Sequence, residues 1–520
     1  VCPVCSPTRA EMLTGRYHPR GGVYSTSAGG ERLDLDEVTI AEIFKKNGYR
    51  TAAFGKWHNG MQYPYHPNAR GFEEFYGFCS GHWGNYFDPM LEHNGQIVKG
   101  NGFLTDDLTD HAINFISENR EDPFFLYLPL NIPHSPMQVP DQFWSRFADK
   151  DLALRGSDST REDVQHSKAA LAMCENIDWN VGRLMENLEA FNLLENTIVI
   201  YFSDNGPNGH RWNGGMRGIK GSTDEGGVRS PLMIQWRGKI REGLKIGELS
   251  SAPDLLPTLV DLSGIEFVPE KALDGMSLRP LLLDEDGVWP DRLFFHHWGN
   301  RTSVRSQQFL MDHQGRLFDM QKDPGQHIDI SADLPDVADK LMLEKEVWEG
   351  TVLAELPAKD LRPFPLGHPD FKFTQIPARD GLGHGNVVRS NRYPNCSYFT
   401  NWTSVDDSIT WEVEVLEGGD FDVQLYYTCP ETSVGSTFTL TFNGNSIEAA
   451  INEAHNPPEM GMENDRIPRQ ESYVKDFVPM HIGPIHLDKG NGKLVLKAKD
   501  LKGAQLMDVR LLMFERVSPT

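Results

Sequence analysis

Apolar runs along the first half of the chain alternate with amphipathic stretches, and this pattern predicts strands that alternate with helices. The apolar positions at 49–54, 124–130 and 198–202 are typical of short buried strands. A long amphipathic helix is predicted over 169–191, shortly before the third strand. Strands separated by helices are typical of an α/β domain. The pattern therefore predicts a mostly parallel sheet flanked by helices.

The ends of two further helices are indicated by their terminal residues. Thr39 and Glu42 have the spacing of a capping box, and Gly48 fits the stop of the same helix. Near the beginning of the chain, Ser6 is predicted as an N-cap and Gly15 as a helix stop. The first turn of that helix would present unpaired N–H groups, which favour an anion.

Polar side chains follow each of the predicted strands. Lys56 and His58 come just after the first strand, His134 lies in a Pro-bounded loop after the second, and Asp204 and Asn205 follow the third. In open α/β sheets, ligand sites form beyond the carboxyl ends of the strands. We therefore expect these side chains to converge on one site.

The character of the chain changes after this α/β pattern, which we place at 1–285. Residues 286–355 predict a small α+β subdomain with short strands and one helix. Residues 356–390 are Pro-rich and aperiodic, which is typical of a linker. From 391 to 517, strand-like runs are separated by Asn-Gly and Gly-rich turns, so a β-sandwich is predicted.

Composition and charge narrow the classes of function. The net charge of −24 disfavours a nucleic-acid partner, because phosphates would be repelled everywhere except at a locally basic pocket. No apolar run approaches the length of a membrane span. Six cysteines in 520 residues are too few for a disulfide framework. The chain begins with Val1 and shows no signal segment, so the sequence decides neither for nor against export.

The C-x-x-C spacing of Cys2 and Cys5 raises two alternatives, a redox pair and a metal clip. A redox pair is disfavoured because it should start a helix after a strand, within a thioredoxin-like unit. A zinc clip would need a second close pair of Cys or His ligands, which the sequence does not offer. Anion chemistry is favoured instead, because Cys5 lies at a predicted helix start and Arg9 adds a full positive charge.

The residues that follow Cys5 carry a family resemblance. The stretch CSPTRAEMLTG resembles the signature of the type I sulfatases, members of the alkaline-phosphatase-like superfamily, which is Cys-x-Pro-Ser/Thr-Arg followed by Leu/Met-Thr-Gly. Further stretches match in family order: GKWHNG, RGFEEFYGF, IPHSP, SDNG, GIKGSTDEGGVRSP and LFDMQKDP. The resemblance covers 1–352. It implies a sulfuric-ester hydrolase acting on a sulfated carbohydrate, with 1–285 as its catalytic domain.

The resemblance also implies a nucleophile and the groups around it. Cys5 would be oxidised after synthesis to formylglycine, whose hydrate attacks sulfur and then expels sulfate from a sulfo-enzyme intermediate by re-forming the aldehyde. Arg9 and Lys56 would hold this group and offset the developing charge. His58 would take the proton that releases sulfate.

Substrate and metal ligands are implied in the same way. His134 and Lys220 would bind the sulfate and protonate the leaving oxygen, and His210 is expected to line a sugar pocket. Asp204, Asn205 and the oxygen of the modified cysteine would bind Ca²⁺. In the family, two acidic residues on a strand upstream of the cysteine complete this metal site, and the sequence begins after that point. We therefore expect a fragment of a longer, secreted precursor, periplasmic or extracellular, that lacks the first strand.

Two rival functions stay open on the same residues. A hydrolase of phosphate or phosphonate esters would use the same fold, and a non-catalytic glycan-binding protein would keep the fold without maturation of the cysteine. The expected partners are a sulfated carbohydrate and a formylglycine-generating enzyme, with neither nucleic acid nor a membrane span. The predicted sandwich resembles modules appended to carbohydrate-active enzymes, and its aromatic residues either stack on sugars or pack in its own core.

Overall fold

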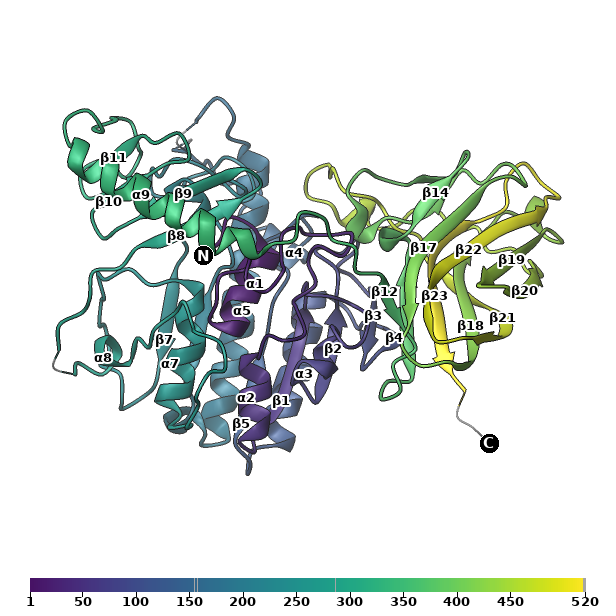
Figure 1. Ribbon diagram of the computed structural model, residues 1–520, viewed down its shortest axis with the longest axis horizontal. Coiled ribbons are helices and arrows are strands. Elements are labelled where there is room, and N and C mark those ends of the chain that lie inside the picture. The colour runs from purple at the N-terminus through teal and green to yellow at the C-terminus, as the bar shows by residue number, and fades with distance from the viewer. Residues whose placement is uncertain (154, 157, 286, 518–520) are drawn as a thin grey trace.

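The computed structural model describes residues 1–153, 155–156, 158–285 and 287–517, and these residues form two lobes. Figure 1 shows the α/β lobe, which contains the N-terminus, beside a C-terminal lobe built of strands. The two lobes are connected after helix α9 (Pro335–Thr351). This arrangement confirms the predicted fold class, an α/β domain followed by a sheet-rich C-terminal part.

The α/β lobe is built around a five-stranded sheet in the order β4-β3-β2-β1-β5. Its strands are β1 (Arg50–Lys56), β2 (Glu74–Phe78), β3 (Met90–His93), β4 (Gln96–Lys99) and β5 (Phe124–Tyr127). β1 pairs in parallel with β2 and β5, whereas β3 and β4 extend the sheet as antiparallel strands. β6 (Val199–Phe202) and β7 (Leu232–Gln235) form a separate antiparallel pair. Parallel pairing is therefore confined to β2, β1 and β5, which form one side of the five-stranded sheet.

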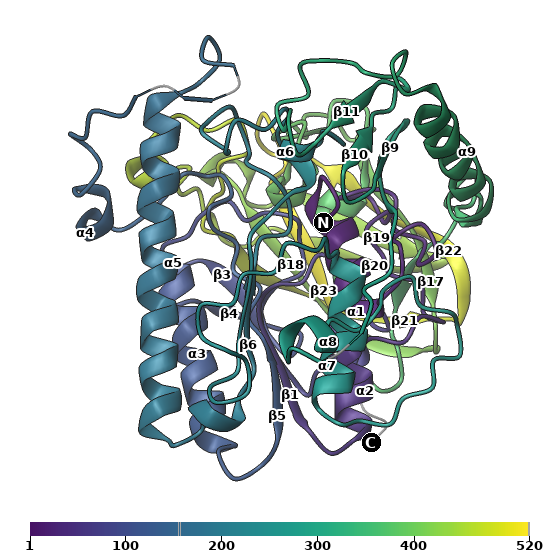
Figure 2. The same cartoon turned by 90° about the vertical axis from the view of Figure 1, so that its left-hand side faces the viewer.

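Helices cover both faces of this sheet, as Figure 2 shows. The α-helices are α1 (Cys5–Thr14), α2 (Ile40–Lys46), α3 (Leu104–Glu118), α4 (Asp141–Trp144), α5 (Val164–Ala190), α6 (Glu225–Val228), α7 (Leu255–Leu262) and α8 (Arg279–Leu282). Ala52 and Phe54 of β1 pack with α3 and α5, and Ala53 packs with α1, α2 and α7. Burial of both faces explains why the strands have continuous apolar sequences. No helix in the described ranges is long and apolar enough to cross a membrane.

The helix ends follow the sequence signals at the predicted capping box and at Gly15, which ends α1, but not at the start of α1. The hydroxyl of Thr39 accepts a hydrogen bond from the Glu42 N–H at 3.2 Å, and the Thr39 N–H donates to the Glu42 carboxylate at 2.6 Å, so the predicted capping box is present. Helix α1, however, begins at Cys5 with Val4 as its N-cap, not with Ser6. Val4 has an extended backbone and makes no side-chain cap, so the first N–H groups of α1 stay available to a ligand.

A small antiparallel sheet follows in the α/β lobe. Its strands are β8 (Phe294–Trp298), β9 (Arg301–Arg305), β10 (Phe309–Met311) and β11 (Leu317–Asp319). Helix α9 packs on this sheet through Leu341, which lies in one cluster with Val304, Met311 and Leu317. The unit has the α+β character that the sequence predicted.

The C-terminal lobe is a sandwich of two six-stranded sheets. The first sheet contains β12 (Phe364–Leu366), β14 (Leu382–His384), β17 (Ser408–Val415), β19 (Thr437–Phe442), β20 (Asn445–Ala450) and β22 (Gly490–Asp500). The second contains β13 (Phe373–Pro377), β15 (Val388–Arg389), β16 (Phe399–Thr400), β18 (Gly419–Thr428), β21 (Val478–Leu487) and β23 (Asp508–Arg516). Trp402, Trp411 and Phe438 lie buried in the core between the sheets. Most of the aromatic residues of this lobe thus pack in its core.

The segment 356–390 differs from the linker that the sequence predicted. It contributes β12 and β14, which pair with β17, and β13, which pairs with β23. These strands are three to five residues long, and two of them contain proline, so their sequences show no alternation. These segments form strands because they pair with strands that are distant in the sequence, and a local sequence pattern does not show such pairing.

Acidification is expected to destabilise the α/β lobe, because several of its histidines are buried as neutral rings. Burial lowers the pKa of His18 to about 4 and holds the pKa values of His82, His134 and His296 well below the usual value of 6.5. Between pH 6.5 and 4 the unfolded chain then binds more protons than the folded chain, so the free energy of unfolding falls as the pH falls. His18 alone would account for about 2 kcal/mol at pH 5. Glu11, whose pKa burial raises to about 7, acts in the opposite direction and offsets only one of these histidines.

Thermal unfolding followed by circular dichroism at pH 7 and pH 5 measures this effect, and we expect the lower Tm at pH 5. His296→Gln should lose part of the pH dependence. His93→Gln, at a partly exposed position, should keep it and serves as the control. An equal or higher Tm at pH 5 would contradict the expectation.

Candidate active site

Arg9 is a residue of α1, and its guanidinium group contacts residues at the ends of three strands. Its Nη1 atom donates to the Lys56 carbonyl at the end of β1 at 2.7 Å and to the Tyr127 hydroxyl at the end of β5 at 3.2 Å. Its Nη2 and Nε atoms donate to Oδ2 of Asp204, just after β6, at 3.0 and 3.2 Å. The predicted convergence of the strand ends is therefore made by direct contacts to one helix.

Cys5 lies in the first turn of α1 and is 4% exposed. Burial opposes ionisation of its thiol, but the positive charges of Lys56 and Lys220 outweigh this effect, and the pKa of Cys5 lies well below its usual value. A negative charge is therefore stabilised at the Cys5 side chain, although the whole chain is strongly acidic.

Lys56 is the last residue of β1 and His58 follows two residues later, and both side chains are buried. Burial, with the charges of Arg9 and Lys220, lowers the pKa of Lys56 to about 8. The Nε2 atom of His58 lies 2.9 Å from the Thr26 carbonyl, so in the neutral ring this nitrogen carries the proton and donates it. The Nδ1 atom is buried and makes no hydrogen bond of ordinary geometry among the described residues, while the His58 ring interacts with the Cys5 thiol and helps to lower its pKa. The free lone pair of His58 is therefore on Nδ1.

His134 reaches the same site from the loop after β5. Burial, together with the charges of Lys220, Lys56 and His82, holds the pKa of His134 well below its usual value. Its Nδ1 atom lies 2.7 Å from the Ser135 carbonyl, and its ring stacks on His82 with centroids 5.7 Å apart. The ring orientation is thus fixed by one hydrogen bond and one stacked neighbour.

Asp204 and Asn205 offer oxygen atoms at this site. Asp204 Oδ2 accepts from Arg9, and burial is outweighed by the Arg9 and Lys56 charges, which lower the pKa of Asp204. The Oδ1 atom of Asn205 is buried and has no partner in the described part of the chain, while its Nδ2 donates to the Gly206 carbonyl at 2.8 Å. A carboxylate and an unpaired carboxamide oxygen fit the oxygen chemistry of Ca²⁺.

His210 makes no hydrogen bond to this cluster through its Nε2 atom, which is buried without a partner among the residues that the structure describes. The neighbouring Arg211 donates to Nδ1 of His166 and to the Asn208 carbonyl, both at 2.8 Å. The role of His210 in a sugar pocket stays a prediction.

The sandwich lobe contributes to the site through Asn395, which the sequence reasoning missed. Its Nδ2 donates to the Thr26 carbonyl at 3.3 Å, the same carbonyl that holds His58. Its Oδ1 accepts from the Gly81 N–H and from Arg379 Nη1, each at 3.2 Å. A Cβ added to Gly81 would lie 2.6 Å from His58 Nε2 and 2.7 Å from Asn395 Nδ2, which shows how closely the lobes approach.

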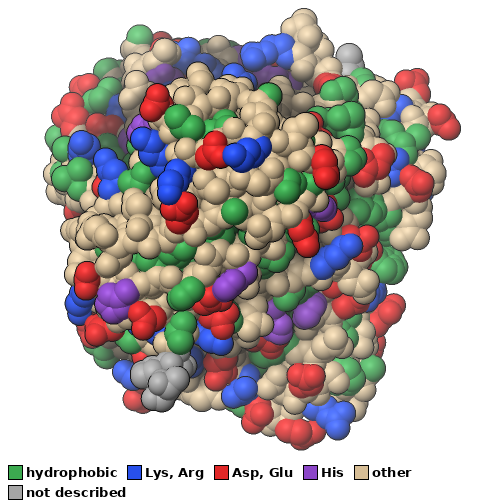
Figure 3. Space-filling view, turned by 90° about the vertical axis from the view of Figure 1, so that its right-hand side faces the viewer, with side chains coloured by type: hydrophobic (Ala, Val, Ile, Leu, Met, Phe, Trp, Pro, Cys, Tyr) green, Lys and Arg blue, Asp and Glu red, His purple; other side chains and the backbone are tan. Residues whose placement is uncertain are grey.

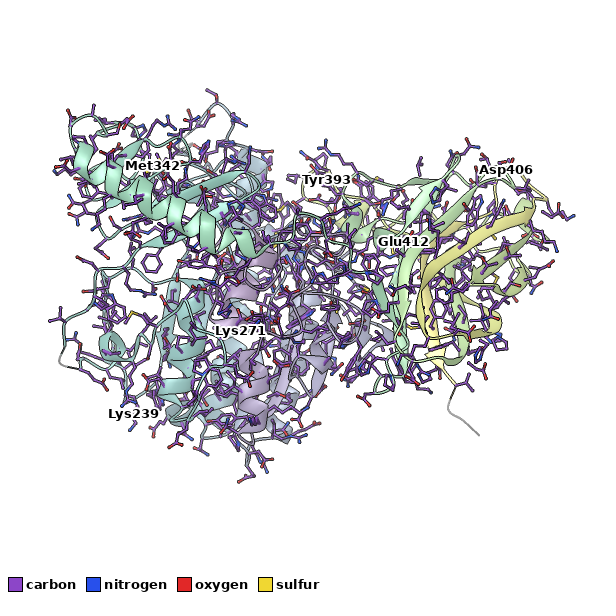
Figure 4. The ribbon with its side chains drawn as sticks, in the orientation of Figure 1. Lys239, Lys271, Met342, Tyr393, Asp406 and Glu412 are labelled. Carbon is purple, nitrogen blue, oxygen red and sulfur yellow. The ribbon has the colours of Figure 1, made fainter. Side chains whose placement is uncertain are left out.

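A second contact from the same loop supports the stacked histidines. The Sγ atom of Cys396 lies 3.2 Å from Nε2 of His82, the ring that stacks on His134. Figure 4 labels Tyr393, two residues before Asn395, at the junction of the two lobes. The loop 393–396 therefore belongs to both the sandwich and the wall of the candidate site.

A cavity of about 790 Å³ lies apart from this cluster. It is lined by β7, by most of the residues between Trp236 and Ala252, and by Leu281 and Leu282 of α8. We therefore place the candidate site where the charged and polar groups converge and not in this cavity.

Comparisons with known proteins agree on one family. The profile of the Sulfatase family matches residues 1–265, and that of the N-sulphoglucosamine sulphohydrolase C-terminal region matches 220–349. Uncharacterized sulfatase YdeN of Escherichia coli K12 is 32% identical over an alignment of 336 positions, which covers 58% of this chain and 58% of that protein. N-acetylgalactosamine-6-sulfatase of Mus musculus is 31% identical over 57% of this chain and 60% of that protein. The chain thus spans less than two thirds of the length of these relatives.

Solved structures support the same placement. The crystal structure of Ps i-CgsB in complex with k-i-k-neocarrahexaose superposes with a TM-score of 0.60 at 29% identity, over 67% of this chain and 82% of that one. The phosphonate monoester hydrolase SpPMH from Silicibacter pomeroyi, at 18% identity and a TM-score of 0.51 over 66% of this chain and 85% of that one, shares the fold alone. With more than half of its residues matched by the family profile, the chain belongs to the sulfatase family.

Proposed function

We propose that this protein hydrolyses sulfate esters of a carbohydrate and that Cys5, matured to formylglycine, supplies the nucleophile. The observation that carries the proposal is the convergence of Arg9, Lys56 and Asp204 around the buried start of α1. When present, the hydrated aldehyde of the matured residue supplies one oxygen for attack on sulfur and a second for release of sulfate.

The charge distribution supports an anionic substrate. The chain carries a net charge of −24, yet Arg9, Lys56 and Lys220 gather where Cys5 begins a helix. The N–H groups of the first turn, which no N-cap side chain of the described residues pairs with, add partial positive charge at the same point. A sulfate group would therefore be bound there and repelled elsewhere.

The proposed roles follow from the positions of the side chains. Arg9 and Lys56 orient the nucleophile and offset charge that develops on the sulfuryl oxygens. His58 offers the Nδ1 lone pair as a base for sulfate release. His134 and Lys220 bind the sulfate from their two loops. Lys220 holds the proton for the leaving oxygen, because the neutral His134 ring keeps its proton on Nδ1, against the Ser135 carbonyl.

We propose that Asp204 and Asn205 bind Ca²⁺ together with the oxygen of matured Cys5. The Oδ1 atom of Asn205 supports this assignment, because it has no hydrogen-bond partner within the described ranges. These oxygens are fewer than the about six to eight that Ca²⁺ takes, so further ligands come from substrate, water or other chain segments. A bound divalent cation would add positive charge at the sulfate-binding position.

The finer parts of the proposal concern partners and context. We propose residues 1–285 and 286–355 as the catalytic unit, a formylglycine-generating enzyme as the maturation partner, and a periplasmic or extracellular location.

Figure 3 shows acidic and basic side chains interspersed on the outer face of the sandwich lobe. That face offers no continuous basic track for a sulfated polymer among the described residues, which favours catalysis over polymer binding by this face.

The experiment compares sulfate and phosphate esters of one aryl alcohol, with the full chain co-expressed with a formylglycine-generating enzyme. We expect kcat/KM to be at least about 100-fold higher for the sulfate ester. A preference for the phosphate ester would instead support the rival hydrolase. Mass spectrometry of the Cys5 peptide separates the other rival, because an unmodified thiol after co-expression would indicate a glycan-binding protein without catalysis.

The sandwich loop provides a further prediction. Asn395→Ala removes the side chain that holds the Thr26 carbonyl and the Gly81 N–H, so His58 loses a fixed orientation. We expect kcat for an aryl sulfate to fall by about 10- to 100-fold with little change in KM. Asn491→Ala, at an exposed position of β22 in the same lobe, is the matched control. Equal kcat values for the two variants would show that the sandwich does not support the site.

A further inference from the structure

Cys2, which the proposed function leaves without a role, lies in a buried cluster with Glu11 and His18. One ligand atom from each residue, sulfur, oxygen and nitrogen, lies within 4.8 Å of the other two. The three side chains are only 1%, 3% and 3% exposed. The Sγ atom of Cys2 is 3.4 Å from Glu11 Oε1 and 4.0 Å from the carbonyl oxygen of His297. The cluster is therefore enclosed by protein and rich in lone pairs.

His18 brings a lone pair that the described residues do not satisfy. Its Nδ1 atom lies 2.6 Å from the Val23 carbonyl oxygen, which can only accept, so Nδ1 carries the proton of the neutral ring. Its Nε2 atom is buried and makes no hydrogen bond of ordinary geometry to those residues, although the backbone carbonyl of His297, which can only accept, lies near the ring. A buried acceptor without a partner is costly, and a metal ion is one group that would satisfy it.

The separation of the sulfur and oxygen donors fits a tetrahedral zinc ion. Zn–S and Zn–O bonds of about 2.3 and 2.0 Å at a tetrahedral angle place sulfur and oxygen about 3.5 Å apart. The observed separation of Cys2 Sγ and Glu11 Oε1 is 3.4 Å. We propose that Cys2, Glu11 and His18 supply three of the four ligands of a buried zinc site, with Cys2 bound as thiolate, Glu11 as carboxylate and His18 through Nε2.

The chemistry of the donor set separates this site from the oxygen ligands at Asp204 and Asn205. Thiolate and imidazole are preferred by Zn²⁺ and are poor ligands for Ca²⁺. Two anionic ligands also balance the two charges of the ion in a buried position. The ion would connect Cys2, before α1, to Glu11 in α1 and to His18 in the loop after it. This connection would hold in place the helix that carries Cys5.

A second cluster of the same residue types shows the contrast. His66, Cys79 and Glu92 also place their ligand atoms within 4.8 Å of one another. Here, however, Nε2 of His66 and Sγ of Cys79 contact Glu92 Oε1 at 2.9 and 3.1 Å, and Nδ1 of His66 accepts from the Asn68 N–H at 3.3 Å. Both ring nitrogens are paired, so this cluster is complete as a hydrogen-bond network and serves as a control.

The test measures zinc binding in a Cys5→Ala background with saturating Ca²⁺, so that neither the nucleophile nor the oxygen site contributes. The full chain is stripped with a chelator and titrated with ZnCl₂ against a chromogenic zinc indicator. We expect one zinc ion per chain and a rise in Tm. Adding Cys2→Ser should weaken zinc binding by at least about 100-fold, because the thiolate ligand is lost, whereas adding Cys79→Ser should leave the affinity unchanged.

Two outcomes would overturn the proposal: no zinc bound by the chain with Cys2 intact, or the same zinc affinity with and without the Cys2→Ser substitution. If the Cys2→Ser variant does not fold, Co²⁺ replaces Zn²⁺ in the chain with Cys2 intact. A sulfur-to-cobalt charge-transfer band and tetrahedral d–d bands are then expected, and their absence would overturn the proposal. These readouts are independent of sulfate hydrolysis, so the zinc site and the proposed function fail separately.

Discussion

Replacing Cys5 by alanine is expected to abolish hydrolysis of sulfate esters, with kcat/KM falling by about 10⁴-fold or more. Alanine cannot be matured to an aldehyde, so the oxygen nucleophile is lost while Arg9, Lys56 and Lys220 still bind the sulfate. Initial rates with an aryl sulfate measure the loss. Binding of inorganic sulfate, followed by calorimetry, should persist because the positive charges remain.

The matched control for this prediction is Cys174→Ala. Cys174 lies on α5 and is exposed, so its replacement should leave kcat/KM unchanged. Cys5→Ala should also leave Tm close to that of the unsubstituted chain, because only the small aldehyde group of the matured residue is removed. Retention of activity by Cys5→Ala with a normal Tm would show that another group supplies the nucleophile.

The parts of the site that could be predicted from the sequence are those fixed by short-range rules. Lys56, His134 and Asp204 follow apolar runs, and the carboxyl ends of strands meet at one edge, so their convergence was expected. The capping box of Thr39 and Glu42 needs only a spacing of three residues and is present in the structure. Where a short stretch of chain contains all the interacting groups, the sequence suffices.

Other features depend on distant partners or on backbone conformation, neither of which a local sequence pattern shows. Asn395 contacts the Gly81 N–H across a separation of 314 residues, and no local pattern distinguishes it from other loop asparagines. The start of α1 at Cys5 depends on the extended backbone of Val4, not on a side-chain cap. The unpaired Nε2 of His18 in the described part of the chain is likewise a property of packing, because its proton is placed by the Val23 carbonyl.

Replacing His58 by alanine is expected to slow the release of sulfate more than the cleavage of the ester. The Thr26 carbonyl holds the proton of His58 on Nε2, which leaves Nδ1 as the base. Burial lowers the pKa of His58, so this base stays unprotonated at neutral pH. Loss of a positioned base reduces a proton-transfer step by about 10²- to 10⁴-fold. Ester cleavage does not need this base, because Arg9 and Lys56 act on the attacking group.

Rapid mixing of the His58→Ala variant with an aryl sulfate separates the two steps. The variant should give a burst of about one aryl alcohol per active site, followed by slow turnover limited by sulfate release. His58→Gln keeps an N–H that can donate to the Thr26 carbonyl but has no basic nitrogen. If the base matters, this variant should behave like His58→Ala. If only packing matters, it should behave like the unsubstituted enzyme. A variant that cleaves the ester slowly without a burst would place His58 in the first step instead, and the free Nδ1 would then serve attack on sulfur rather than departure of sulfate.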